Sequence, residues 1–383
     1  MTTAEKITRN RCLISNLKDV EEAFRIKRFP AFIGTTNEPR SQDIENDLIF
    51  DISKSSGMIQ IRDLMPMEII YSKYHCEAIG PMWKNHHNQF VNFLNNFPVC
   101  NIIEPGGSNN YMAKAFLELN KKSFWTIIEP TPNNISDNPR LNIIKGFFNK
   151  NFIKGAQYDA VVHSHTFEHM HNPEDFIKTI SDSLSIGCYH IFTVPNLRKY
   201  FENRYSNVLN FEHTFYLSEE FVEYYLTKYG FEIIEKKYFL EHSIFYSAVK
   251  RTLPVLDLEC NNFYDDNKRL LENYNQYFDK LVQALNEKLD KKKYYLFGAH
   301  VFSQFLIKKG LKDEKIINIL DNSKIKNNQR LYGTELICSL PGIVGNDECP
   351  IVVVFAGGYQ EEIERQLVEI NSNVIIINDN NIR

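Results

Sequence analysis

Several features are scarce in this 383-residue sequence, and each absence narrows its function. No apolar run is long enough to cross a bilayer, so we expect no membrane-spanning segment. Residues 1–6 do not have the pattern of a secretory signal. The seven cysteines are scattered without pairing spacing, which favours a reducing, cytoplasmic location. A net charge of −4 gives no electrostatic case for a nucleic-acid partner.

Two common phosphate-binding motifs are also missing. The sequence contains no G-x-x-x-x-G-K-[ST], so ATP and GTP are not expected as ligands. The dinucleotide motif G-x-G-x-x-G is incomplete, because Gly106 and Gly107 are adjacent and Asn110 stands where a last glycine would be. A pyrophosphate needs close helix packing at that position, which argues against NAD and FAD.

A nucleotide-type pattern is nevertheless present near residue 100. An apolar run ends at Glu104, and a turn with Gly106 and Gly107 leads into a helix-like segment at 111–119. A second apolar run then ends at Glu129. Glycines let a backbone approach a ligand closely, and an acid at this spacing suits the two hydroxyls of a ribose. The alternative is a purely structural turn between strand and helix.

These features favour S-adenosylmethionine, which has a positively charged end and no phosphate. The acid that precedes the glycine turn suits such a ligand. An aromatic side chain after the third strand could flank the adenine. We expect the cofactor contacts to come from Glu104, Gly106, Gly107, Asn109, Glu129, Phe147 and His163.

The order of elements predicts an α/β protein. We expect a small α+β module at 1–80, a Rossmann-like doubly wound sheet at 81–255 and a Rossmann-like domain at 256–383. The last domain repeats the strand, glycine, helix, strand and acid order, with Gly298 and Asp321 in the corresponding places. A doubly wound fold without a nucleotide would show the same order of elements, so whether this domain binds a ligand stays open.

A histidine-rich segment follows one of the predicted strands. It contains His163, His165, His169 and His171, with Glu168 between them. Ligands of doubly wound sheets lie beyond the carboxyl ends of strands. One interpretation is a zinc or iron site formed by His163, His165 and His169. Another is an active-site acid or base, for which His169 is favoured. The third is a set of polar turn residues.

A second candidate cluster precedes the helix predicted at 218–229. Glu212 and His213 are adjacent there, two residues after Asn210. A histidine base needs a partner that fixes its tautomer and supports its charged form, and Glu212 is a candidate. A structural salt bridge is the alternative.

With these residues in view, the chain resembles the sugar-nucleotide C-methyltransferases of deoxysugar biosynthesis over nearly its whole length. The family motif V-E-I-G-S-N-D-G is matched in part at 103–110, and G-I-E-P at 127–130. The carboxyl-terminal pattern Y-G-A, D and P-G-T is similar to 297–299, Asp321 and 332–334. The resemblance implies an N-terminal zinc-binding domain, a central S-adenosylmethionine domain and a C-terminal Rossmann-like domain.

The catalytic motifs of the family are matched incompletely. A functional histidine of the family falls on His169, and the family's I-Y-H-E-H falls on 209–213. Glu212 and His213 match, while Asn210 replaces the tyrosine that helps to hold a ketosugar and its enolate. The resemblance thus implies catalytic positions at His213, His169, Glu212 and Asn210, with His213 as the preferred base. It also implies substrate contacts from Tyr71 and Tyr74.

The family's zinc-binding motif is mostly lost. Its two C-x-x-C pairs fall on 12–15 and 53–56, where only Cys12 remains. Hydroxyl groups do not replace thiolates on a structural zinc, so we expect no metal there.

The expected function is methyl transfer to a sugar nucleotide or related activated sugar. Carbon and oxygen are equally expected as acceptors, and nitrogen of an aminosugar is a further alternative. The alternative that is not an enzyme is a degenerate, non-catalytic scaffold for glycan assembly. We expect a small-molecule nucleotide-sugar partner, no nucleic acid and no membrane, and the oligomeric state stays open.

Overall fold

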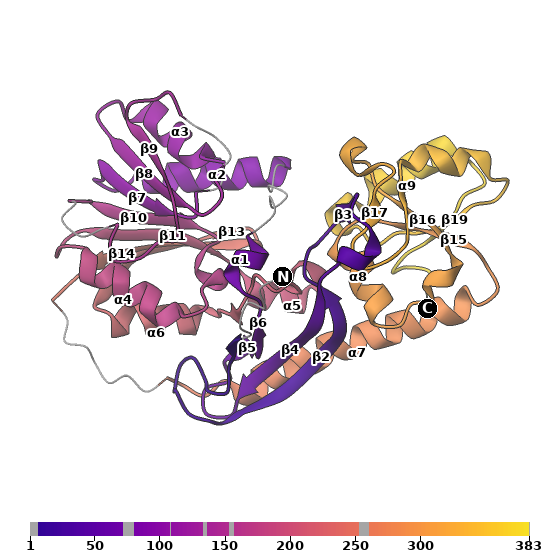
Figure 1. The fold of residues 1–383 in the computed structure, drawn as a ribbon, viewed down its shortest axis with the longest axis horizontal. Coiled ribbons are helices and arrows are strands. Elements are labelled where there is room, and N and C mark those ends of the chain that lie inside the picture. Colours follow the sequence, from indigo (N-terminus) through magenta and orange to yellow (C-terminus); the bar gives the residue numbers. More distant parts are fainter. Residues whose placement is uncertain are drawn as a thin grey trace. The chain divides into compact units, whose positions relative to one another are not determined.

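The computed structural model describes residues 7–71, 80–107, 109–132, 136–152, 157–252 and 260–382. The chain divides into two compact units (Figure 1). Unit 1 comprises Met1–Glu21, Asp51–Asn203 and Glu212–Asn267, and unit 2 comprises Glu22–Phe50, Arg204–Phe211 and Lys268–Arg383. This division is not the one expected from the sequence, because residues 22–50 group with the C-terminal part. The three-domain division stays a prediction.

Unit 1 is built on a seven-stranded sheet with the order β13-β14-β11-β10-β7-β8-β9. The strands from β11 to β9 in this order are parallel, and β14 and β13 are antiparallel additions at one edge. Their bounds are β7 (Asn101–Pro105), β8 (Phe124–Glu129), β9 (Leu141–Lys145), β10 (Ala160–Ser164), β11 (Tyr189–Pro195), β13 (Phe231–Phe239) and β14 (Ser243–Lys250). The predicted α/β class with a mainly parallel central sheet is confirmed.

Helices cover both faces of this sheet (Figure 1). They are α2 (Pro81–Leu94), α3 (Tyr111–Leu119), α4 (Pro173–Ser183) and α6 (Glu219–Lys228), and the short α5 (Leu197–Glu202) follows β11. Side chains alternate across a strand, so Ile102 packs with the α2 and α3 layer while Ile103 packs with the α4 and α6 layer. Because both faces are covered, the strands are continuous apolar runs.

Local sequence signals set the ends of these helices. Pro173 stands at the first position of α4, and the side chain of Asn172 accepts a hydrogen bond from the Asp175 amide at 3.1 Å. This is the usual N-terminal cap, which satisfies an amide that has no partner inside the helix. After α6, Gly230 takes the left-handed conformation with φ of 74°, which is common for a glycine that ends a helix.

The N-terminal part of the chain adds small elements. The strands are β1 (Ile7–Thr8), β2 (Val20–Pro30), β3 (Thr35–Thr36), β4 (Glu45–Ser53), β5 (Ile59–Ile61) and β6 (Asp63–Leu64), with α1 (Met67–Ile70) and the later strand β12 (Phe215–Tyr216). In unit 1, β1 pairs with β6 and β5 pairs with β12. In unit 2, β3 pairs with β17 (Arg330–Leu331).

The two segments that correspond to the family's zinc-binding pairs meet in space within unit 1. The sulfur of Cys12 lies 3.2 Å from the hydroxyl of Ser56, and Ser55 donates to Ser15 at 2.9 Å. The carboxylate of Asp19 accepts a hydrogen bond from the Ser55 amide at 2.7 Å. A thiol–hydroxyl contact and a hydroxyl–hydroxyl hydrogen bond therefore join the two segments where the family has thiolates, and Asp19 holds the second segment. The absence of zinc stays a prediction.

Unit 2 contains a parallel sheet of five strands with the order β18-β16-β15-β19-β20. Its elements are β15 (Tyr294–Phe297), β16 (Ile316–Leu320), β18 (Cys338–Ser339), β19 (Ile351–Val353), β20 (Ile375–Ile377), α8 (Val301–Lys308) and α9 (Gln360–Ile370). The long α7 (Tyr264–Lys288) precedes them and is rich in charged residues. In the described parts of the chain, no helix combines the length and the apolar character needed to cross a membrane.

Asp321 of unit 2, which takes the place of a ribose-binding acid in the sequence pattern, accepts hydrogen bonds from the protein itself. One oxygen of Asp321 accepts hydrogen bonds from the Ala299 amide at 3.0 Å and from Nζ of Lys326 at 2.8 Å. Its other oxygen accepts from the Ser323 amide at 2.9 Å. These contacts hold the glycine turn and the strand end together, which is the architectural explanation of the repeated pattern.

Candidate functional site

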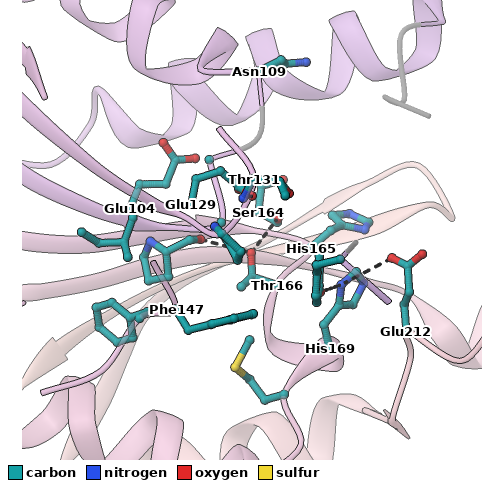
Figure 2. A pocket seen from close by; sticks show the side chains of 18 of the residues that line it. Glu104, Asn109, Glu129, Thr131, Phe147, Ser164, His165, Thr166, His169 and Glu212 are labelled. Carbon is teal, nitrogen blue, oxygen red and sulfur yellow. Dashed lines mark hydrogen bonds and ion pairs between the residues drawn. The ribbon is translucent and has the colours of Figure 1, made fainter. Parts of the chain in front are cut away.

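A cavity of about 300 Å³ lies at the carboxyl ends of β7, β8 and β10 in unit 1. Residues after β9 complete its wall, so four neighbouring parallel strands point into one site. This is where ligands of doubly wound sheets bind. The sequence-predicted residues among its lining are Glu104, Gly106, Gly107, Asn109, Glu129, Phe147, His165, His169, Glu212 and Tyr71. Figure 2 labels seven of them, including Glu104, Glu129 and His169.

The two glycines make a turn that a side chain would fill. Gly106 has φ of 76°, and a Cβ there would lie 3.0 Å from Oγ1 of Thr166. A Cβ on Gly107 would lie 2.6 Å from Cγ2 of Ile127 and 2.9 Å from Oε2 of Glu104. The turn therefore requires glycine at both positions and leaves backbone exposed to the cavity.

Glu104 is a buried acid with an unused oxygen. Its Oε2 accepts a hydrogen bond from the indole nitrogen of Trp125 at 2.8 Å. Among the residues that the structure describes, its Oε1 has no hydrogen-bond partner. Burial raises the pKa of Glu104 to about 8, partly opposed by the Trp125 hydrogen bond. A positively charged or donating group in the cavity would favour the ionised carboxylate.

The second acid, Glu129, ends β8 and is also buried. Its Oε1 accepts a hydrogen bond from the Thr131 amide at 3.1 Å, which fixes the carboxylate at the cavity wall. The ring of Phe147 is 39% exposed and lies edge-on to the ring of Tyr71, with 6.2 Å between their centroids. An acid for ribose hydroxyls and an accessible ring for adenine are thus present. These residues fit an adenosyl ligand.

His163 has a different environment from the one expected. It lies on β10, is fully buried, and its Nε2 is 3.0 Å from Nε2 of His190. Its ring stacks on Phe192 and packs on Phe176 in the α4 and α6 layer. The alternation of β10 turns this side chain into the core, so the predicted cofactor contact does not fit its position.

The predicted metal set His163, His165 and His169 is not brought together, because His163 faces the core. Within the described residues, two other sets of three place one ligand atom each within 4.8 Å of one another. One set is Glu168, His169 and His213, and the other is His86, His165 and His242.

His169 forms the cavity wall together with Tyr71 and Glu212. Its Nδ1 lies 3.2 Å from the hydroxyl oxygen of Tyr71. The same nitrogen lies 3.9 Å from Oε2 of Glu212, and Figure 2 shows this ion pair between His169 and Glu212. Its Nε2 lies 3.9 Å from Oε1 of Glu168. Burial raises the pKa of Tyr71, with Glu212 adding to the effect, so its hydroxyl stays protonated.

The other predicted base, His213, lies behind His169. The two ring centroids are 5.2 Å apart, and His213 is not among the residues that line the cavity. Glu168 is fully buried beside this pair, and burial raises the pKa of its carboxyl to about 8. The structure therefore brings His169 to the cavity surface with His213 packed against it.

Besides His163 and His213, two further predicted residues are not placed at the cavity. Asn210 belongs to unit 2, where its amide donates to the carbonyl of Asn207 at 3.1 Å. Tyr74 lies outside the described residues. Their predicted roles stay predictions.

The cavity also has lining residues that the sequence analysis did not select. Trp83 and His87 come from one face of α2, and Thr166 follows β10. The spacing of Trp83 and His87 by four residues puts them on one helix face, but nothing in the sequence indicates that this face meets the cavity. Thr166 could have been found, because it lies in the segment after a predicted strand.

Comparison with known proteins agrees with this geometry. Residues 76–236 match the family described as Methyltransferase domain. The chain carries a methyltransferase domain. Its methyl donor is S-adenosylmethionine. No curated protein is similar enough to count as a match.

Several solved structures are similar to part of the chain. An O-methyltransferase family protein from Burkholderia thailandensis is 9% identical, with 44% of this chain and 57% of that chain covered and a TM-score of 0.38. The N-methyltransferase NodS from Bradyrhizobium japonicum is 13% identical, with 45% and 99% covered and a TM-score of 0.33. A SAM-dependent methyltransferase from Aquifex aeolicus is 13% identical, with 42% and 89% covered and a TM-score of 0.36. The chain thus spans little more than half of the Burkholderia protein.

Proposed function

We propose that the methyltransferase domain acts on a sugar nucleotide or related activated sugar in deoxysugar or surface-glycan biosynthesis. The observation that carries this proposal is the placement of His169, Tyr71 and Glu212 on the wall of the cavity that also contains Glu104 and Glu129. A base and a neutral donor are thus next to the residues that fit the methyl donor.

The choice of a sugar rests on the sequence resemblance. The motif matches at 103–110, 127–130 and 297–299 support a sugar substrate. A further support is the contact between Cys12 and Ser56, because the positions of the family's zinc ligands are neighbours in this fold. The scattered cysteines support a reaction in a reducing cytoplasm.

The donor is held by residues of the glycine turn and the two acids. S-adenosylmethionine supplies an electrophilic methyl group on a sulfonium. Gly106 and Gly107 let the backbone approach it, Glu129 accepts from ribose hydroxyls, and Glu104 receives the positive end. Because methyl transfer is a displacement at carbon, holding donor and acceptor in line contributes much of the rate.

His169 is the proposed base, with Glu212 as its partner. A carboxylate 3.9 Å from Nδ1 stabilises the imidazolium that forms when His169 takes a proton. The sequence favoured His213 as base, but the cavity surface is formed by His169, so we assign His213 to a positioning role behind it.

Two acceptor atoms are compatible with this arrangement. A sugar hydroxyl would give its proton to His169 as the new bond to oxygen forms. A carbon acceptor requires an enolate, and the protonated hydroxyl of Tyr71 would then donate to the enolate oxygen. Tyr71 would thus supply the donor that the family takes from the tyrosine replaced by Asn210.

The test is incubation of the purified protein with methyl-labelled S-adenosylmethionine and a panel of nucleotide sugars, followed by mass spectrometry. NMR of the product distinguishes carbon, oxygen and nitrogen as the methylated atom. We expect one nucleotide sugar to accept the label and the His169→Gln variant to lose this activity. The matched control is His171→Gln, because His171 is a nearby histidine outside the cavity lining. Donor binding without transfer to any nucleotide sugar would contradict the proposed substrate.

A further inference from the structure

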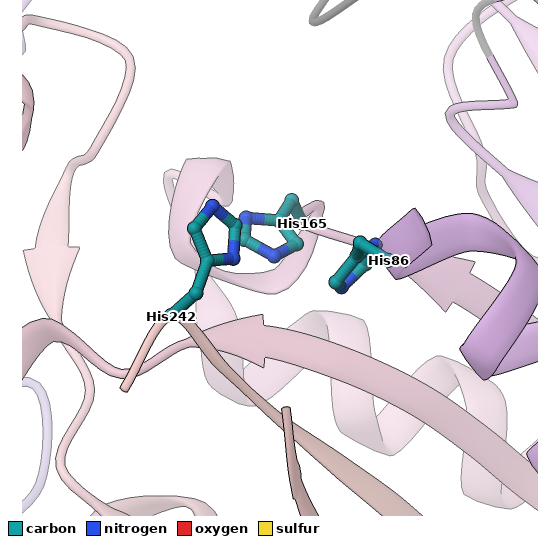
Figure 3. A group of neighbouring side chains, drawn as sticks. All are labelled: His86, His165 and His242. Carbon is teal, nitrogen blue, oxygen red and sulfur yellow. The ribbon is translucent and has the colours of Figure 1, made fainter. Parts of the chain in front are cut away.

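Three histidines from distant parts of unit 1 converge beside the cofactor cavity (Figure 3). His86 lies on α2, His165 follows β10, and His242 lies in the turn between β13 and β14. One ring nitrogen from each lies within 4.8 Å of the other two. The three rings are neighbours in pairs, with centroids 5.2 to 5.7 Å apart.

His86 offers a buried nitrogen that no hydrogen bond satisfies. The side chain is fully buried, and its Nε2 lies 3.3 Å from the hydroxyl of Thr193. Its Nδ1 has no hydrogen-bond partner among the described residues. A buried polar atom without a hydrogen-bond partner is destabilising, so a group that binds this nitrogen would remove that penalty.

The two ring nitrogens of His165 face different polar groups. Its Nε2 lies 2.9 Å from the hydroxyl of Ser243, and its Nδ1 lies 3.6 Å from Oε1 of Glu168. Neither oxygen of Glu168 has a hydrogen-bond partner in the described chain. A carboxylate behind the outer nitrogen of a histidine is the arrangement that orients metal-binding imidazoles and increases their basicity.

One aromatic side chain borders the whole cluster. The indole of Trp83 contacts all three rings, with centroid distances of 4.9 to 5.2 Å, and forms an apolar wall.

We propose that His86, His165 and His242 bind a divalent transition-metal ion of the zinc class. Imidazoles are ligands that zinc prefers, and three histidines with an open fourth position are an established zinc arrangement. At zinc–nitrogen distances of 2.0–2.1 Å, tetrahedral ligand nitrogens are about 3.4 Å apart. In the structure the three nitrogens lie within 4.8 Å of one another. Side-chain rotations that shorten these distances by less than about 1.5 Å would therefore give zinc geometry.

Such an ion would join α2 and the β13–β14 turn to the end of β10. It would also fix His165 and Trp83, which both line the cofactor cavity. The site uses none of the residues that correspond to the family's zinc motif. The competing arrangement is a metal-free cluster in which the hydroxyl of Ser243 bridges His165 and His242, at 2.9 and 2.6 Å.

The experiment uses the full chain after removal of metals with a chelator. Zn²⁺ is titrated by calorimetry, and Co²⁺ is titrated by visible absorption. We expect one equivalent of Zn²⁺ to bind, and the cobalt form to show tetrahedral bands without thiolate charge transfer. His242→Gln should weaken Zn²⁺ binding at least about tenfold, because it removes a direct ligand. Ser243→Ala removes the competing hydroxyl and should not weaken binding.

The matched control is His87→Gln, which changes the neighbouring histidine of α2 and leaves all three ligands in place. The proposal is overturned if the wild-type protein binds no Zn²⁺, or if His242→Gln binds it as tightly as the wild type. It is also overturned if His213→Gln abolishes binding while His242→Gln does not, because the ion would then occupy the set of Glu168, His169 and His213. The wild-type cobalt spectrum is informative even if a variant does not fold.

Discussion

The hydroxyl oxygen of Tyr71 lies 3.2 Å from Nδ1 of His169, although 98 residues separate them in the sequence. The contact joins the residue that follows α1 to the segment after β10. It places a protonated hydroxyl and an imidazole side by side on the wall of the cavity at the carboxyl ends of β7, β8 and β10. This pair is where we expect substrate chemistry to occur.

The first prediction concerns this pair. His169→Gln should lower kcat by about 10²- to 10⁴-fold, as loss of a general base does, and Tyr71→Phe should lower it by about tenfold. Binding of S-adenosylhomocysteine, measured by calorimetry, should change little in either variant. His171→Gln is the matched control. Equal kcat values for His169→Gln and the control would remove His169 from the mechanism.

The second prediction concerns the glycine turn. In Gly107→Ala the new methyl group would meet Ile127 at 2.6 Å, so either the turn moves or the protein loses about 1–3 kcal/mol of stability. We expect affinity for S-adenosylhomocysteine to fall at least tenfold. Gly80→Ala is the control, because a Cβ there has no neighbour within 4 Å among the described residues. Unchanged affinity in Gly107→Ala would show that the turn does not shape the donor site.

The third prediction follows from the pKa of Glu104, which burial raises to about 8 from an ordinary 4.5. A carboxyl with a raised folded-state pKa favours folding below the unfolded pKa. That stabilisation is lost as pH rises toward 8, at up to about 1.4 kcal/mol per pH unit. The glutamine in Glu104→Gln does not titrate, so the variant does not lose this stabilisation. Its free energy of unfolding should therefore rise relative to that of the wild type as the pH increases from 5 to 8.

Denaturant titrations across that pH range measure the effect without added ligand. Glu118→Gln, an exposed substitution on α3, is the control. Parallel stability curves for wild type and Glu104→Gln would mean that Glu104 is already ionised at neutral pH in the free protein.

The fourth prediction concerns unit 2. Arg330 donates to both oxygens of Asp43 at 2.7 Å, and both side chains are almost fully buried. Asp43→Ala leaves the guanidinium buried without its carboxylate partner and should cost about 3 kcal/mol of stability. The amide of Gly333 also loses its acceptor. Lys312→Ala, which breaks the exposed pair with Asp290, should leave the unfolding midpoint unchanged. Similar midpoints for the two variants would contradict this account.

Several residues that the sequence predicted for the donor site lie together on one cavity. Glu104, Gly106 and Glu129 follow directly from strand ends and a glycine turn, and parallel strands bring such ends to one edge of a sheet. His169 was found in the same way. Local pattern and topology were sufficient because each of these residues lies within a few positions of a strand end.

The sequence could not separate neighbours whose side chains diverge. His163 and His165 are two residues apart, yet one enters the core and the other lines the cavity, because β10 ends between them and His165 has a left-handed backbone. Nor could it indicate that His86 and His242 meet His165. Those contacts depend on the packing of α2 and of the β13–β14 turn, which no local pattern encodes.

We infer that the cavity lined by Glu104 and Glu129 binds the methyl donor. Calorimetry with S-adenosylhomocysteine tests it most directly, with Glu129→Ala compared with the wild type and with Glu118→Gln. We predict one binding site per chain, wild-type affinity in Glu118→Gln, and an affinity at least tenfold weaker in Glu129→Ala through loss of the ribose contacts. Wild-type affinity in Glu129→Ala would contradict the assignment of the cavity.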